Sequence, residues 1–259
     1  MALNGLKFKH IKYGKNENQK EHSTYLSDNN QIEAKSQVKD LGVVMDNNMN
    51  YDQHIQGQIE KVKGISAWIY RTFRTRDAHV MLTLWKSLAI PHLDYCSQLW
   101  SPSKRSLIQQ LEQLQKSFLK GLPELQHLNY WERLKQLKIY SLERRRDRYR
   151  IIYTWCILEG IVLNFNYDNG KGGIQWYTNQ RLGRMCHLKP VNVRNKNIWR
   201  DCLSEEGQRL FNARPKSLRN ISNCPRKHLK NSWTIFYPHY QTSLCFPTIF
   251  ILGEQILIV

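Results

Sequence analysis

The chain has 259 residues, with 39 Lys and Arg side chains against 21 Asp and Glu, so its formal charge is +18. With 41% hydrophobic and 11% aromatic residues, its composition is that of a folded protein, which excludes low-complexity disorder for most of its length. No apolar run approaches the roughly 20 residues that span a bilayer, and the N-terminus lacks the apolar core of a signal peptide. We therefore expect an intracellular protein of the cytoplasm or nucleus, without a membrane as partner.

The positive charge is concentrated in one part of the chain. Residues 1–60 carry 7 basic and 8 acidic side chains, whereas residues 61–230 carry 32 basic and 12 acidic ones. A field of this size favours a polyanion, so we expect nucleic acid (RNA, DNA or a hybrid) as a partner that is bound without sequence preference. The plainer interpretation is that the basic charge only keeps a domain soluble. The pattern predicts no oligomeric state.

Short strands and turns are predicted for the first fifty residues. Apolar and polar residues alternate over 6–13, which is the period of a half-buried strand. A turn at 27–30 separates two short extended segments and predicts a hairpin. A further strand is predicted over 37–45, where it ends in the turn-rich 46–48.

From about residue 51 the period becomes that of α-helices. One apolar face of a long helix is formed by Ile55, Ile59, Val62, Ile65, Ile69 and Phe73. Further helices are predicted over about 77–89, near 93–99, from Pro102 towards Pro123, over 130–137, and after Ser141 as N-cap. The second helix is expected to stop before Pro91 because proline disfavours helix in the residue that precedes it.

These patterns predict an α+β protein in which a small antiparallel hairpin region is followed by a mainly helical part. The chain divides into strands over 1–50, helices over 51–163, a basic region over 164–237 and an apolar tail over 238–259. In the basic region, regular periodicity is confined to 203–211.

The chemistry of a two-metal polymerase or nuclease site is missing from the sequence. Such a site needs clustered carboxylates that hold two ions about 4 Å apart, and the chain has no Asp-Asp pair. A zinc site is conceivable but has non-standard spacing, and its candidate ligands are Cys186, His187, Cys202, Cys224 and His228. We therefore expect neither a metal site nor another cofactor, and the scattered cysteines do not predict a disulfide framework.

The best local signal for nucleic acid is a cluster of arginines at 144–150. Members of the cluster that are four residues apart share a helical face, and two tyrosines between them offer stacking surface. The predicted phosphate-binding residues are Arg144, Arg145, Arg148 and Arg150. The alternative, weighed evenly, is an ordinary solvated helix with internal ion pairs, because Glu143 and Asp147 are also four residues apart.

Beyond these patterns, the chain carries a series of short motifs over about 3–237. Among them are Val38-Lys39-Asp40-Leu41-Gly42-Val43, Leu93-Asp94-Tyr95-Cys96-Ser97-Gln98-Leu99-Trp100, Tyr130-Trp131-Glu132-Arg133-Leu134-Lys135 and Tyr140-Ser141-Leu142-Glu143-Arg144-Arg145-Arg146. Others lie at 3–8, 13–14, 54–55, 68–73, 84–91, 111–118 and 207–212. The order and spacing of these motifs resemble the C-terminal part of a reverse transcriptase of non-LTR, Jockey-like retrotransposons. Residues from about 238 match nothing in this family, and Arg214 stands where the family usually has an apolar residue.

This resemblance implies a fragment of an RNA-directed DNA polymerase from a transposable element. In the family, Mg²⁺ is held by aspartates of the palm, which precede the matching region, so we expect this chain alone to be inactive. Lys7 is similar to the lysine of the palm's fourth motif, here without partner acids. Asp40-Leu41-Gly42-Val43 resembles the primer-grip hairpin, with Leu41 and Gly42 as the primer-grip-like residues, and the helices from 54 onward resemble the thumb. The alternative is a decayed open reading frame, or a basic interaction module, without selected activity.

Overall fold

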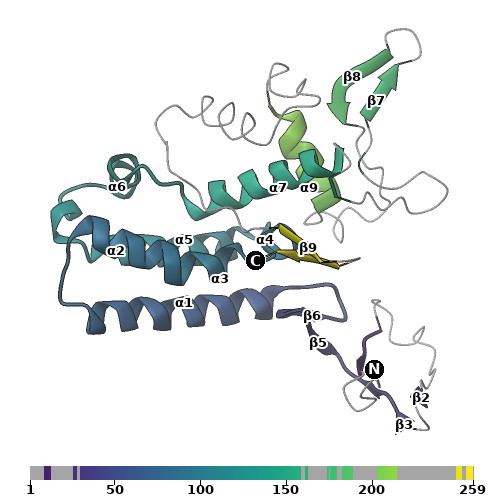
Figure 1. Cartoon of the computed structure of the whole chain (residues 1–259), viewed down its shortest axis with the longest axis horizontal. Helices are drawn as coiled ribbons and strands as arrows, with labels where there is room; N and C mark the ends of the chain where they lie inside the picture. The colour runs from purple at the N-terminus through teal and green to yellow at the C-terminus, as the bar shows by residue number, and fades with distance from the viewer. Residues whose placement is uncertain are drawn as a thin grey trace. The chain divides into compact units, whose positions relative to one another are not determined.

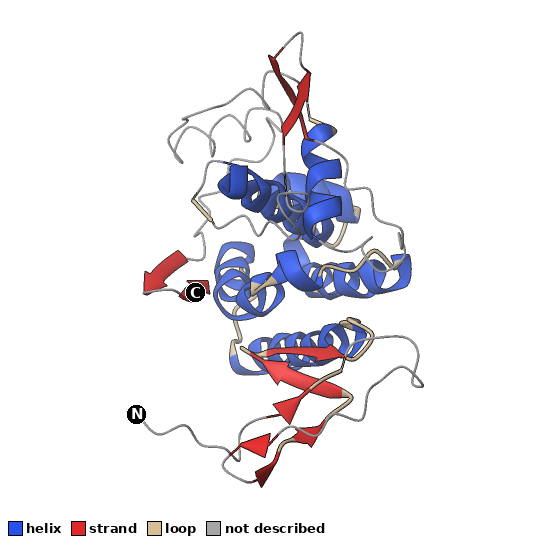
Figure 2. Ribbon diagram, turned by 90° about the vertical axis from the view of Figure 1, so that its right-hand side faces the viewer, coloured by secondary structure: helices blue, strands red, loops and turns tan. Residues whose placement is uncertain are grey.

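The computed structural model of the chain describes residues 9–12, 26–27, 30–158, 161–162, 174, 176–179, 183–188, 203–214, 249–252 and 255–258. These residues belong to two compact units, 1–60 and 61–259, and each unit is considered by itself. Their secondary structure is mainly helical, and their strands form separate two-stranded pairs (Figures 1 and 2). The α+β prediction is thus confirmed, while Lys7 lies outside the described residues.

The first unit contains short strand pairs. They are β1 (Lys9–His10) with β4 (Glu33–Ala34), in parallel, and β2 (Leu26–Ser27) with β3 (Asn30–Gln31), antiparallel. The second pair confirms the hairpin predicted around 27–30. The strand predicted over 6–13 is represented by β1 alone among the described residues of that stretch.

The longest hairpin of the first unit is formed by β5 (Gln37–Asp40) and β6 (Val43–Asp46), with Asp40 opposite Val43. The prediction of one strand over 37–45 is therefore wrong. Leu41 and Gly42 make a two-residue turn and both have positive φ, 44° and 85°. Turns with positive φ at both central residues match the twist of the two strands, and Gly42 adopts this conformation without a steric penalty.

Helix α1 (Asp52–Thr72) agrees with the long helix predicted from the apolar period. A tight turn precedes it, in which the Asp46 carboxylate accepts hydrogen bonds from the backbone N–H groups of Asn48 and Asn50, at 2.9 and 2.7 Å. The predicted apolar face is mostly buried, since Ile55, Ile59, Val62 and Ile69 are each at most 2% exposed.

The second predicted helix does not stop before Pro91. Helix α2 (Ala78–Leu84), capped by Asp77, continues through a π-helical turn, η3 (Trp85–Ala89), into α3 (Ile90–Asp94). In a regular α-helix the ring of Pro91 would collide with the carbonyl four residues earlier, and it has no N–H to donate. The wider turn, in which the Ile90 N–H donates to the Trp85 carbonyl, lies directly before the proline and relieves this conflict.

The helices that follow agree with the predicted order. They are α4 (Ser97–Trp100), α5 (Arg105–Lys120), the 3₁₀ turn η4 (Pro123–Leu125), α6 (Tyr130–Leu137) and α7 (Leu142–Leu158). Phe118 of α5 stacks on Trp85, with ring centroids 4.5 Å apart, and packs against Tyr70 at 5.2 Å. As predicted, Ser141 caps α7, its hydroxyl accepting from the Arg144 N–H at 3.3 Å.

Helix α9 (Leu203–Asn212) packs beside α7 and closes a second apolar cluster. Its members are Ile151, Trp155, Cys156, Val162, Ile174, Leu188, Leu210 and Phe211. Gly207 allows the close approach of the helices, because a Cβ there would collide with the Thr154 hydroxyl of α7.

The remaining strands form two antiparallel pairs. They are β7 (Trp176–Asn179) with β8 (Gly183–Leu188), and β9 (Ile249–Leu252) with β10 (Gln255–Ile258) in the apolar tail. Asn212 of α9 ties β8 to this unit, since its side chain bonds both the N–H and the carbonyl of Leu188, at 2.8 and 3.0 Å. The division of the chain into four parts stays a prediction.

Candidate nucleic-acid interface

Arg145 of the predicted phosphate-binding cluster is committed to an ion pair inside the protein. Its guanidinium donates to both carboxylate oxygens of Asp94 at the end of α3, with N–O distances of 2.6 to 2.9 Å. The Tyr149 hydroxyl donates to the same carboxylate at 3.0 Å, and burial together with the Asp94 charge raises the pKa of this tyrosine. The two paired side chains are only 16% and 11% exposed, so this arginine fastens α7 to α3.

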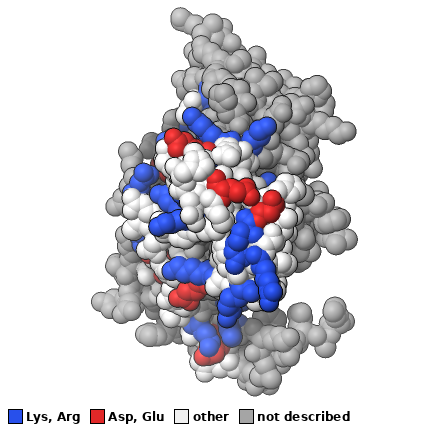
Figure 3. Space-filling view, turned by 90° about the vertical axis from the view of Figure 1, so that its left-hand side faces the viewer, with Lys and Arg blue, Asp and Glu red and all other residues white. Residues whose placement is uncertain are grey.

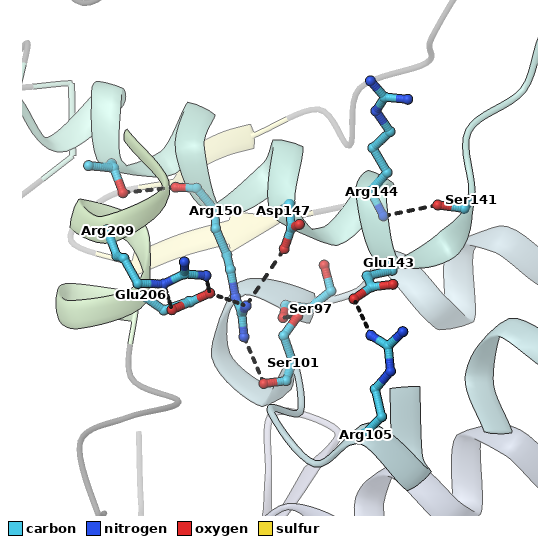
Figure 4. Close-up of polar contacts among 11 residues, drawn as sticks. Ser97, Ser101, Arg105, Ser141, Glu143, Arg144, Asp147, Arg150, Glu206 and Arg209 are labelled. Atoms are coloured by element: carbon cyan, nitrogen blue, oxygen red, sulfur yellow. Dashed lines mark hydrogen bonds and ion pairs between the residues drawn. The ribbon is translucent and has the colours of Figure 1, made fainter. Parts of the chain in front are cut away.

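Arg150 has a similar structural role on another side of α7. It is 5% exposed and donates to the Ser101 carbonyl, next to α4, at 2.7 Å (Figure 4). The same guanidinium lies 3.9 Å from the carboxylates of Asp147 and Glu206. Glu206 of α9 also binds Arg209, so the contacts of Arg150 join α7 to α4 and α9 (Figure 4).

Two further arginines of α7 are also drawn into the packing. Arg146 is 4% exposed, and its burial lowers the pKa of its guanidinium despite the charge of nearby Glu112. Arg148 is half-buried and lies over the Tyr140 ring, 5.7 Å from its centroid. Burial lowers the pKa of Arg148 as well.

Arg144 differs from these arginines, because its half-buried side chain points away from the ion pairs of Arg105 and Arg150 (Figure 4). The structure gives Arg145 and Arg150 partners within the protein, and it contains one internal ion pair of the kind the alternative expects, between Arg150 and Asp147. That Arg145 and Arg150 bind phosphate stays a prediction. Apolar periodicity did not reveal these pairs, because charged side chains on opposite sides of α7 bind partners on other helices. That Arg144 and Arg148 bind nucleic acid stays a prediction.

The start of α7 is held by a buried carboxylate from another helix. Glu112 of α5 is 7% exposed and accepts from the backbone N–H groups of Leu142 and Glu143, at 3.3 and 3.1 Å. It also accepts from the Tyr130 hydroxyl, and burial and the Glu112 charge raise the pKa of this tyrosine. A carboxylate on the first-turn N–H groups is favourable because they carry the positive end of the helix dipole. This contact fixes α7 on α5.

A basic and aromatic face lies exposed on the part of α1 that belongs to the second unit. Lys61, Gly64, Trp68 and Arg71 are spaced by three, four and three residues, so they share one side of the helix, and all four are exposed. The Trp68 side chain is 46% exposed, and a Cβ at Gly64 would meet nothing within 4 Å. We refer to these four residues as the α1 face.

The α1 face was missed in the sequence because the apolar stripe on the other side of α1 dominates its pattern. The signal was nevertheless present, as a Trp and two cations with a glycine at helical spacing. Among the cations that follow, Arg74 is exposed, whereas Arg76 is turned inward. Arg76 donates to the Tyr70 carbonyl at 2.9 Å and lies over the Tyr70 ring. On the face drawn in Figure 3, Lys and Arg cover more of the described surface than Asp and Glu.

The tip of the β5–β6 hairpin presents Leu41 and Gly42, the two residues of the primer-grip resemblance. The Leu41 side chain is 77% exposed and its backbone is left-handed, a conformation that costs a non-glycine residue about 1–2 kcal/mol. The hairpin is anchored by His54 of α1, which is 4% exposed and accepts from the Val44 N–H through Nδ1 at 3.4 Å. Burial lowers the pKa of His54, and the charge of Lys39 adds to this shift.

Within the described ranges, no group of three or more His, Cys, Asp or Glu side chains is placed to hold a metal ion. Cys202, Cys224 and His228 of the conceivable zinc set lie outside those ranges. Of the helices that the structure describes, none has both the length and the apolar character that crossing a membrane requires. No protein-family model, no curated protein and no solved structure matches the chain.

Proposed function

We propose that the chain is the nucleic-acid-holding part of a non-LTR retrotransposon reverse transcriptase, in which the α1 face lies against the template–primer hybrid. The observation that carries the proposal is the α1 face itself, an exposed helical stripe that combines two cations, a tryptophan and a glycine. The ordered motifs described for the sequence supply the family, and the excess of basic charge over 61–230 agrees with a polyanionic partner.

Each member of the α1 face has a separate task in this proposal. Lys61 and Arg71 neutralise phosphates, and this releases condensed counterions. Gly64 leaves room for a sugar-phosphate backbone to approach the helix closely, and Trp68 offers an apolar plane to a sugar or a base. None of these contacts reads base edges, so binding is independent of sequence.

The β5–β6 hairpin has the second role in the proposal, as the element that holds the 3′ end of a primer. Its exposed Leu41, kept in a left-handed conformation, is the kind of strained and accessible residue that gathers at ligand-binding sites. Lys7 would then belong to the palm. The chain alone binds nucleic acid but does not polymerise, so primer extension with Mg²⁺ or Mn²⁺ should give no template-dependent incorporation.

The proposal is tested by the salt dependence of binding to an RNA–DNA hybrid, measured by fluorescence anisotropy. In the test variant, Lys61 and Arg71 of the α1 face are changed to Gln together with Lys63, an exposed neighbour outside the face, which keeps helix propensity and removes three exposed charges. If two of the three contact phosphate, the slope of log affinity against log salt should fall in magnitude by about 1.5 to 2.

The matched control changes Lys86, Lys104 and Arg105 to Gln, three cations that are also exposed but lie on η3 and at the start of α5. The control should keep a slope within about 0.5 of the unaltered chain, because its charges face no nucleic acid in the proposal. Equal losses in the two variants would contradict a defined interface and support a basic interaction module instead. Gly64→Leu offers an uncharged check, since it should weaken binding while leaving the net charge unchanged.

A further inference from the structure

Helix α6 presents one large aromatic side chain to solvent. Trp131 is 62% exposed, although it is the second residue of a helix that is otherwise well packed. A tryptophan has a large apolar surface, so leaving it in water forfeits more burial free energy than most exposed side chains do. Its exposure therefore needs an explanation from the surrounding structure.

The outward position of Trp131 is imposed by contacts on the other side of α6. Tyr130 bonds the buried Glu112, and Leu134 is only 2% exposed. Arg133 donates through Nε to the Leu125 carbonyl at 2.9 Å. These three anchors fix the rotation of the helix, so Trp131 cannot turn inward without breaking them.

The surface around Trp131 carries two cations and one acid. Lys135 and Lys138, four and seven residues further on, are exposed, and among the described residues neither takes part in an ion pair. The neighbouring acid, Glu132, is occupied by the capping box, in which its carboxylate accepts from the Asn129 N–H at 2.8 Å. The other exposed position of α6 is Gln136, so the helix offers one apolar plane among polar groups, two of which are cations and one of which, Glu132, is an acid bonded to the backbone.

We propose that Trp131, Lys135 and Lys138 form a stacking site for single-stranded nucleic acid, on a surface separate from the α1 face. The base of a nucleotide can stack on the indole, and the phosphate of the same nucleotide can pair with a lysine. One nucleotide therefore matches both the exposed aromatic ring and the cations. A protein partner that buried an apolar patch would need neighbouring apolar side chains, which these positions of α6 lack. This inference extends the proposed function to a second surface and to a second class of nucleic acid.

The site is tested with twelve-nucleotide oligo(dT), oligo(U) and a blunt duplex as probes, in anisotropy titrations of the full chain. Trp131→Ala should weaken binding of the two single strands by about fivefold or more, with less than a twofold effect on the duplex. Trp131→Phe should recover most of the affinity, because a smaller aromatic ring still stacks. Lys135→Gln combined with Lys138→Asn should weaken single-strand binding and lower its salt slope by about 1 to 1.5; Asn is chosen because residue 138 has a φ of 53°.

Two results would overturn the stacking site. The first is an affinity for single strands that is the same in Trp131→Ala, in Trp131→Phe and in the unaltered chain. The second is self-association of the unaltered chain in sedimentation that Trp131→Ala abolishes, which would assign the surface to a second copy. The variant of the α1 face, measured alongside, separates the two proposals: it should lower hybrid binding even where the Trp131 variants bind normally.

Discussion

The burial of Arg145 leads to a quantitative prediction about stability. Changing Arg145 to Gln removes the guanidinium that donates to both oxygens of Asp94. The Asp94 side chain, which is only 11% exposed, then lacks its charged partner. Removal of one partner of a buried ion pair costs about 3–5 kcal/mol, because the other charge remains buried without compensation. Since the Tyr149 hydroxyl still donates to Asp94, we expect a loss near the lower limit, about 3 kcal/mol.

The loss is measured by equilibrium unfolding in urea, followed by tryptophan fluorescence. Trp85 and Trp100 are each 1% exposed and report on the helical unit directly. Arg74→Gln is the control, an exposed arginine that follows α1, and should change the free energy of unfolding by less than about 0.5 kcal/mol. Asp94→Asn combined with Arg145→Gln should recover part of the loss, because no unpaired charge is then buried.

A small and equal effect of Arg145→Gln and Arg74→Gln would refute the reasoning. It would mean that the pair is solvated and that Arg145 is available to a ligand, as the sequence pattern had indicated. Conversely, if Arg145→Gln loses much stability, weaker nucleic-acid binding by this variant is explained by the damaged fold and not by a lost phosphate contact. Binding experiments on the cluster should therefore use Arg144 and Arg148.

Two further predictions concern the packing of α9 and the anchoring of the hairpin. Gly207→Ala should lower the melting temperature, since its Cβ meets the Thr154 hydroxyl, whereas Gly57→Ala, with nothing within 4 Å, should stabilise α1 by about 0.5–1 kcal/mol. Circular dichroism melts measure both, and a gain from Gly207→Ala would show that the helices are not closely packed there. The neutral His54 ring accepts from the Val44 N–H, and burial lowers its pKa below the ordinary 6.5. Its contribution is therefore complete above pH 6.5 and is lost as the pH falls through the lowered pKa, by at most about 1.4 kcal/mol per pH unit. His54→Asn keeps an acceptor near Nδ1 but does not titrate, so amide exchange in 37–46 should become less sensitive to acid; an unchanged profile would contradict this assignment.

Several elements could be predicted from local sequence because their causes are local. The apolar period of α1, the prolines on either side of α5 and the stripe of α9 each indicate a helix within one continuous segment. The N-cap at Ser141 was also predicted correctly, since it needs only its own helix. The two errors in element boundaries arose at Leu41–Gly42 and at Pro91. At Leu41–Gly42 a turn with positive φ reverses the chain within a stretch that is rich in strand-forming residues. Before Pro91 a π-helical turn lets the helix continue through a proline, which average propensities disfavour.

The candidate site was harder to predict than the helices, because exposure is not encoded in a charge pattern. Sequence alone determined that this protein is basic over 61–230, mainly helical and without an Asp-Asp pair, since these follow from composition and spacing. Only the tertiary structure decided which cations are accessible. Asp94, Ser101 and Glu206 are between 49 and 56 residues away in the chain from the arginines that they bind, so no local pattern could reveal that α7 is cross-linked by its charges. The physical reason is that a buried arginine must find its partners across the fold, whereas the cations of the α1 face, with water on that side of the helix, remain available to phosphate.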